Sequence, residues 1–449
     1  MAWTMAKWPS AWQLSTLLLA VGWALSFSVM TACAATANLA AKYLNPQLTA
    51  THTMPLALMT FTTGLTNVIL PLLFRRLGRW PTYVLATAMG LAGSFLCLIA
   101  IQLASSLALL LLGMVGIGFG LSAGNNYRFA VLLLGVPKEE HAVASSWVIA
   151  GGVLGAALGP EYAKHLQLVL SQPYAGVFIG GAVAYALHMF LLFVGKRMLH
   201  FSDGKARSSD EPAAESSVEA PAPALPALPR PLSAILAQPR CFAAVSVAAI
   251  CYAMMVSLMA ALPLSMADPK PAWFLDQPTD IAAIAATGFS FGETSTVIQA
   301  HMICMFAPSF VTGHVIRCLG ARVVQAIGAC IYVGACLAML LSIEYVGYML
   351  GQSLLGLGWN FCFVASSASL VLRSEPGQEL TKLQALNDLC VFGLSGLVSL
   401  LSSPALRALG WGGMQLLGFG TAAAILCIVA ATEVAATRET GMSEGTAAK

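Results

Sequence analysis

Two short motifs in the second half of the 449-residue chain carry sulfur and imidazole at helical spacing. Met255 and Met259 are four residues apart, and so are His301 and Met305, so each pair falls on one face of a helix. Thioether sulfur is a soft, neutral donor that suits Cu(I), and imidazole adds a stronger donor that titrates near neutral pH. These four residues, here called the Met/His set, predict a site for a soft cation that needs no permanent counter-charge.

Packing is the ordinary alternative for each motif alone, because methionine commonly fills apolar helices. Taken together, the two motifs favour a metal site more strongly than either does alone, because they lie in consecutive apolar segments that run in opposite directions. At a rise of about 1.5 Å per residue, Met259 and His301 lie at matching depths, and so do Met255 and Met305.

The composition places the motifs in a membrane protein. Hydrophobic residues make up 58% of the chain and charged residues only 9%, against about 25% in soluble domains. The net charge of +3 is too small for a nucleic-acid binder. The sequence has no nucleotide-binding loop or hydrolase motif, so we predict neither an enzyme nor a permanently bound cofactor. The expected surroundings are the lipid bilayer.

The apolar runs predict an all-α polytopic membrane protein with twelve transmembrane helices in two six-helix halves. The expected halves are residues 1–200 and 240–435, joined by a flexible cytoplasmic linker at 201–239 and followed by a cytoplasmic tail at 436–449. The predicted spans are 13–38, 53–74, 82–103, 106–130, 142–163, 174–195, 241–265, 294–316, 322–342, 345–371, 381–402 and 409–432.

Basic residues predict the orientation, because Lys and Arg are retained on the cytoplasmic side. With both termini inside, 17 of the 22 Lys and Arg residues face the cytoplasm and four face out, leaving Arg128 unassigned. We expect a multi-pass protein of a bacterial inner membrane, although a eukaryotic membrane is compatible with the sequence.

Ionisable side chains inside a span are costly, so each is a candidate for function. Asp388, next to Asn387, is the deepest acid, and it either accepts a proton during transport or is neutralised by Arg128 or a helix end. Glu161 lies near the outer surface, where a structural role is favoured over gating. The eleven cysteines lie mostly inside apolar segments and are expected to be free thiols.

The two halves carry a faint repeat, in which Arg75-Arg76-Leu77-Gly78-Arg79 corresponds to Arg317-Cys318-Leu319-Gly320-Ala321-Arg322. Twelve spans, a central linker and this paired loop resemble the major facilitator superfamily, whose halves rock about a midplane site. Arg75 and Arg317 stand where that family usually has an acidic residue, which puts its usual latch between the halves in doubt.

Within that superfamily the chain resembles the CcoA-like copper importers. The resemblance rests on the Met/His set, on Met305-Phe306-Ala307-Pro308, and on five further segments: Asn126–Ala130, Ala150–Val153, Gly159–Glu161, Arg230–Ser233 and Gln384–Asp388. It implies copper uptake into the cytoplasm by alternating access, with the four residues of the set as ligands and a cytoplasmic copper chaperone as a candidate partner. Because the family uses membrane cysteines, Cys33, Cys251 and Cys304 become accessory candidates.

Two other functions stay open. A related branch resembles riboflavin transporters on the same scaffold, which predicts a roomy cavity with aromatic and amide groups such as Trp359 and Asn360. The second is a metal sensor or assembly partner that binds without net flux, for which the long linker is the sequence feature that hints at partner recruitment.

Overall fold

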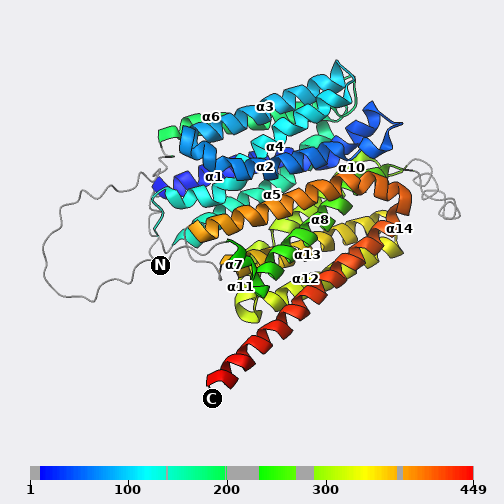
Figure 1. The fold of residues 1–449 in the computed structure, drawn as a ribbon. Coiled ribbons are helices and arrows are strands. Elements are labelled where there is room, and N and C mark those ends of the chain that lie inside the picture. The colour runs from blue at the N-terminus through cyan, green and yellow to red at the C-terminus, as the bar shows by residue number, and fades with distance from the viewer. Residues whose placement is uncertain are drawn as a thin grey trace, which may run out of the picture.

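The computed structural model describes residues 11–137, 140–197, 199, 232–268, 288–371 and 378–447. Within these ranges the chain is helical and contains no strand (Figure 1). The predicted linker falls mostly outside them, apart from the short helix α7 (Leu232–Leu236) and the start of α8.

The N-terminal half consists of six long helices joined by short connections. Alanine, leucine and glycine dominate these segments, and each is long enough to cross the roughly 30 Å bilayer core. The helices are α1 (Ala11–Leu44), α2 (Met54–Leu77), α3 (Arg79–Gln102), α4 (Leu107–Ala130), α5 (His141–Leu166) and α6 (Ala175–Val194), with single 3-10 turns η1 (Thr49–Thr51), η2 (Val131–Leu133) and η4 (Gly195–Arg197).

The C-terminal half repeats this plan with two irregularities. Its long helices are α8 (Pro239–Ala267), α10 (Phe291–Phe306), α11 (Ser309–Leu319), α12 (Ala321–Leu341), α13 (Tyr345–Val371) and α14 (Gln378–Ala447). Gly410, with φ of +68°, interrupts α14, and the chain turns back there (Figure 1). A left-handed residue is easiest for glycine, so α14 is two spans joined by a tight turn. Its second part continues to Ala447, within the predicted tail.

Nine helical stretches in the described ranges are long and apolar enough to cross a membrane, and a bent pair makes ten. Counting α14 as two and adding the 26-residue α5 gives the twelve spans that the sequence predicts. The fold class is therefore confirmed as an all-α polytopic membrane protein.

The predicted continuous span 294–316 is wrong in one respect, because it is broken into α10 and α11. The two helices meet at an angle of 43° around Ala307 and Pro308. Proline has no backbone N–H and its ring clashes with the preceding turn of a helix. A proline at position 308 is therefore expected to bend the span.

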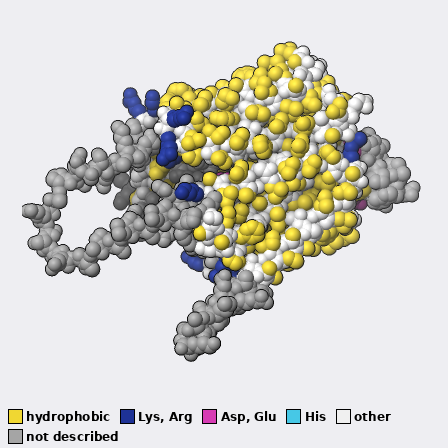
Figure 2. Space-filling view, viewed as in Figure 1, with side chains coloured by type: hydrophobic (Ala, Val, Ile, Leu, Met, Phe, Trp, Pro, Cys, Tyr) yellow, Lys and Arg dark blue, Asp and Glu magenta, His cyan; other side chains and the backbone are white. Residues whose placement is uncertain are grey.

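The two halves lie side by side, with α1–α6 forming one group and α8–α14 the other (Figure 1). Across the interface, α2 packs on the first part of α14, and α5 packs on α10. Hydrophobic side chains cover the visible flank, while Lys and Arg gather mainly at one end of the bundle (Figure 2). We call this the basic end, where α2 ends and α3 begins.

The repeated loop has the same backbone in both halves. Gly78 links α2 to α3 with φ of +85°, and Gly320 links α11 to α12 with φ of +82°. A side chain at Gly320 would meet nothing within 4 Å, so the left-handed backbone rather than space requires glycine there.

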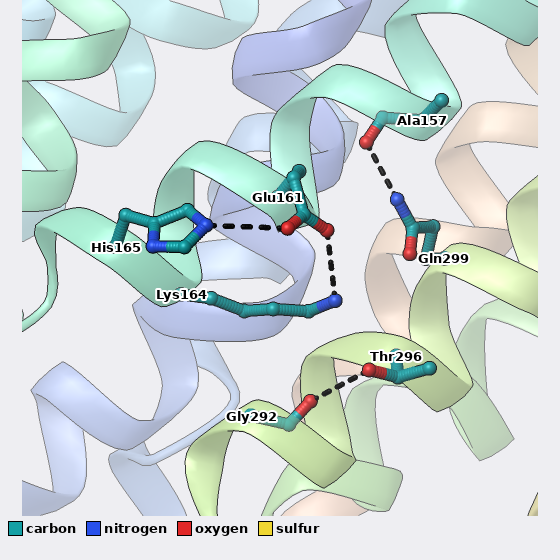
Figure 3. Close-up of polar contacts among 7 residues, drawn as sticks. All are labelled: Ala157, Glu161, Lys164, His165, Gly292, Thr296 and Gln299. Atoms are coloured by element: carbon teal, nitrogen blue, oxygen red, sulfur yellow. Dashed lines mark hydrogen bonds and ion pairs between the residues drawn. The ribbon is translucent and has the colours of Figure 1, made fainter.

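At the end opposite the basic end, polar contacts join the halves. The Asn38 amide donates a hydrogen bond to the Ala260 carbonyl over 2.9 Å, and Lys42 pairs with Asp268. The Gln299 amide donates to the Ala157 carbonyl over 2.7 Å (Figure 3). The Ser403 hydroxyl donates to the Thr49 carbonyl over 2.6 Å. This end is therefore closed in the present conformation.

Candidate functional site

A central cavity of about 1330 Å³ lies between the two halves and extends to the basic end. Helices α1, α2, α4 and α5 line it from one side, and α8, α10, α11, α13 and α14 from the other. Small-molecule sites typically measure about 300–1,000 Å³, so this cavity has room for a solute of several rings.

One wall of the cavity is a chain of aromatic rings that crosses from one half to the other. The ring centroids of Trp23 and Phe27 on α1 are 4.9 Å apart. Phe27 meets Phe306 of α10 edge to face at 4.8 Å, and Phe306 lies 6.1 Å from Trp359 of α13. All four line the cavity, so it offers ring faces from both halves.

The aromatic wall continues inside the C-terminal half. Trp359 stacks on Phe363 with centroids 4.8 Å apart and planes 12° from parallel. Tyr252 of α8 meets Trp359, Phe363 and Phe392 at 5.4, 5.6 and 5.5 Å. Such ring pairs favour offset or edge-to-face contact, and the free faces can stack on a planar ligand.

Polar side chains line the cavity nearer the basic end. Asn126 and Arg128 come from α4, and Gln384 and Asp388 from α14. Asp388 is the one carboxylate among the described residues that line the cavity. The charge of Arg128 acts on it across the interface, and Asn387 donates a hydrogen bond to it. The structure thus brings two predicted candidates, Arg128 and Asp388, into the same cavity, and it places Asn387 in the buried wall behind Asp388.

A buried hydrogen-bond network holds the polar segment of α4 from behind. The Tyr127 hydroxyl lies 2.7 Å from Nε2 of His188 on α6, and the Ser26 hydroxyl of α1 lies 2.9 Å from Nδ1 of the same ring. The Tyr83 hydroxyl of α3 donates to the Asn126 side chain over 2.8 Å. Helices α1, α3, α4 and α6 therefore fix the residues around Tyr127.

The Met/His set lies elsewhere, in the packed interior of the protein, on α8 and α10 of the C-terminal half. Its members are at most 2% exposed, and none is among the described residues that line the cavity. Met255, Met259 and Met305 belong to one hydrophobic cluster, and His301 is fully buried on the same helix as Met305.

His301 has a defined orientation within that interior. Its Nδ1 lies 2.8 Å from the Gln352 carbonyl of α13, and because a carbonyl only accepts, Nδ1 donates. Its Nε2 has no hydrogen-bond partner among the described residues. An imidazole held this way carries a free lone pair on Nε2, the arrangement common in metal-binding histidines.

The accessory cysteines are free thiols in different places. Cys33 is buried in α1, and Cys251 is buried in α8, where its thiol contacts the Ala248 carbonyl at 3.3 Å. Cys304 is half-buried on α10 and interacts with Ser353. No group of three His, Cys, Asp or Glu side chains fit for a metal ion occurs in the described part of the chain.

Glu161 lies on α5 towards the closed end, away from the cavity. It pairs with Lys164 at 2.9 Å and with His165 at 3.3 Å on its own helix (Figure 3). Its side chain is 49% exposed, and its negative charge is balanced by these two residues of the same helix.

Sequence reasoning missed most of the aromatic wall, because it proposed only Trp359 of the seven members as a substrate contact. The wall draws residues from five helices far apart in the chain, so no single periodic pattern marks it. One usable signal exists, because Trp23 with Phe27 and Trp359 with Phe363 are aromatic pairs at a spacing of four residues.

Comparison with known proteins supports the transporter type. No protein-family model matches the chain. The riboflavin transporter RfnT of Brucella anthropi is 28% identical over 378 residues, covering 83% of this chain and 84% of that protein. The uncharacterized MFS-type transporter YddS of Bacillus subtilis is 24% identical over 392 residues, covering 81% and 80%. Copper as the substrate receives no support from these relatives.

Solved transporters share the fold. An auto-inhibited POT family peptide transporter matches with a TM-score of 0.60 at 12% identity, covering 94% of this chain and 97% of that chain. A bacterial homologue of the iron transporter ferroportin gives 0.57 at 14%, and a variant of the nucleoside transporter NupG gives 0.64 at 11%, each covering 93% of this chain and 99% of the other. The chain therefore shares the fold of these transporters, and the relatives that it resembles are transporters rather than enzymes, one of them described as MFS-type.

Proposed function

We propose that the chain carries riboflavin, or a close flavin, across the membrane. The observation that carries this proposal is the aromatic wall of the 1330 Å³ cavity, which both halves build. A flavin offers a planar fused-ring system that can stack on such faces. Metal–nitrogen and metal–sulfur bonds measure about 2.0–2.3 Å in zinc sites, so a cavity of this size is poorly matched to a lone ion. The similarity to a riboflavin transporter points the same way.

Uptake of labelled riboflavin by cells that lack their own importer tests the proposal. Cells with the wild-type chain should accumulate riboflavin, and Trp359→Ala should abolish most of the uptake. Trp147→Ala is the matched control, because Trp147 is 44% exposed on α5 and lies outside the cavity wall. Absence of uptake by correctly inserted wild-type protein, or full uptake by Trp359→Ala, would contradict the proposal.

Copper uptake is the second candidate, and the orientation of His301 favours it. With Nδ1 on the Gln352 carbonyl, Nε2 keeps a lone pair that could bind a soft ion. Copper accumulation should then be lost in Met255→Ala/His301→Ala, and delivery would pass to a cytoplasmic chaperone. Equal copper accumulation by wild type and variant at equal protein level would remove the Met/His set from the transport path.

For either substrate we propose import into the cytoplasm of a bacterial cell, with the basic end and both termini inside. Retention of Lys and Arg on the cytoplasmic side supports this orientation. A fluorescent-protein fusion at the C-terminus should fluoresce, whereas an alkaline phosphatase fusion there should stay inactive. The reverse pattern would overturn the orientation.

A further inference from the structure

In the cavity the aromatic wall lies deeper than the charged side chains, although Phe74 lies at the basic end and Asn67 lies near the middle of α2. Tyr252 lies near the middle of α8, and Trp359 lies near the middle of α13. Arg128 lies in the last turn of α4, and Gln384 lies close to the start of α14. These helix ends are all at the basic end, so these polar side chains form a separate level between the aromatic wall and that end.

Both halves contribute to the polar level, and their charges are opposite. Asn126 and Arg128 belong to the N-terminal half, and Gln384 and Asp388 to the C-terminal half. Asp388 and Arg128 both act electrostatically on Tyr252, so the two charges reach the nearer edge of the aromatic wall. A ligand stacked on that wall therefore has a carboxylate and a guanidinium within reach of its substituents.

The polar level is held in shape before a ligand arrives. The Tyr83 hydroxyl fixes Asn126 from behind, and the His188 network fixes the adjacent Tyr127. On the other side, Asn387 donates to Asp388 from a buried position. Preorganised polar groups discriminate between ligands more strongly than apolar walls, because a ligand that lacks their partner leaves them unpaired.

We propose that this polar level recognises the hydroxylated chain of the flavin, with Asp388 as the main specificity-determining residue. The inference rests on the proposed function and goes one step further, since it assigns the two parts of the substrate to two levels. The ring stacks on the wall around Trp359. The chain hydroxyls donate to the Asp388 carboxylate, which only accepts, while Arg128 only donates. The substrate class is therefore a planar ring that carries a polyol, and the polyol bridges the two halves.

Two flavins distinguish the levels in one binding experiment with the purified chain. Riboflavin has the ring and the polyol, whereas lumiflavin has the ring with a methyl group in place of the polyol. Titration by flavin fluorescence should show the wild type preferring riboflavin by about tenfold or more, as expected for charge-assisted hydrogen bonds. Asp388→Asn should weaken riboflavin binding by about tenfold and leave lumiflavin unchanged. Trp359→Ala should weaken both.

Glu344→Gln is the matched control, because it makes the same carboxylate-to-amide change at an exposed residue between α12 and α13. It should leave the dissociation constants of riboflavin and lumiflavin unchanged. This result would show that a change in the ratio of the two constants reports on residues of the cavity. Equal weakening of both flavins in Asp388→Asn, or no wild-type preference for riboflavin, would overturn the role of the polar level while leaving flavin transport intact. Failure of the folded wild type to bind either flavin would instead overturn the proposed function.

Discussion

The central cavity and the Met/His set are both built from residue types that bind ligands, yet their surroundings differ. The cavity takes its lining from both halves and reaches one end of the bundle. The Met/His set belongs to helices of the C-terminal half and is buried, with every member at most 2% exposed and none lining the cavity. A transported solute must contact the surfaces that move apart, so the cavity has the access that transport requires in this conformation. Helical spacing predicts which side chains share a face, whereas access depends on how the two halves pack.

The largest expected contrast between the two regions is in riboflavin affinity. Trp359→Ala removes a ring that joins both parts of the aromatic wall, and a loss of about 2 kcal/mol or more is typical of such anchors. Met259→Leu keeps the volume of a buried side chain and should leave the affinity unchanged. Fluorescence titration of both variants checks this. A larger loss of riboflavin affinity in Met259→Leu than in Trp359→Ala would place the substrate at the Met/His set instead of the aromatic wall.

The second contrast concerns stability and uses one glycine from each region. A side chain at Gly356 of α13 would lie 2.4 Å from the His301 carbonyl, so Gly356→Ala should force α10 away and cost about 1–3 kcal/mol. Gly313 of α11 lines the cavity and has nothing within 4 Å, so Gly313→Ala should be neutral or stabilising by up to about 1 kcal/mol. Thermal unfolding in detergent measures both. Equal midpoints for the two variants would show that the packing around His301 is loose.

The fold followed from the sequence because its determinants are local. Twenty-residue apolar runs and charged punctuation define the spans, and the repeated loops at Gly78 and Gly320 mark equivalent turns in the two halves. The break at Pro308 has a sequence signal as well, since proline inside a span favours a bend, although the predicted span runs straight through it. The domain boundaries stay a prediction, with most of the linker outside the described residues.

The site was only partly predictable. Arg128 and Asp388 were recognisable, because a charge inside a span needs a partner or water wherever it lies. Tyr252, Phe306 and Phe392 were not, since an aromatic residue in an apolar helix looks the same whether it faces lipid, the core or a cavity. That distinction arises only when helices from both halves meet. The Met/His set stays a prediction for the same reason, because spacing alone cannot decide whether an ion can reach it.

A smaller effect is expected from the network that supports the polar level. Tyr127→Phe removes the hydroxyl that meets His188 but keeps the ring, so the unfolding free energy should fall by about 0.5–1.5 kcal/mol. Because Asn126 and Arg128 flank Tyr127, the KM for riboflavin should rise while the maximal uptake rate changes little. Uptake kinetics in cells with matched protein levels separate the two quantities. An unchanged KM would show that Tyr127 stabilises the half without positioning the polar level.

The smallest expected effect is the sharpest test of the comparison. In Cys251→Ser the hydroxyl can keep the contact that the thiol makes with the Ala248 carbonyl, so the loss of stability should stay below about 1 kcal/mol and riboflavin uptake should be unchanged. Copper accumulation is the informative readout, because serine is a poor donor for a soft ion. If Cys251 and the Met/His set serve only to pack the interior, copper accumulation should be the same in Cys251→Ser as in the wild type. A selective loss of copper accumulation, with riboflavin uptake intact, would mean that the two regions serve two substrates.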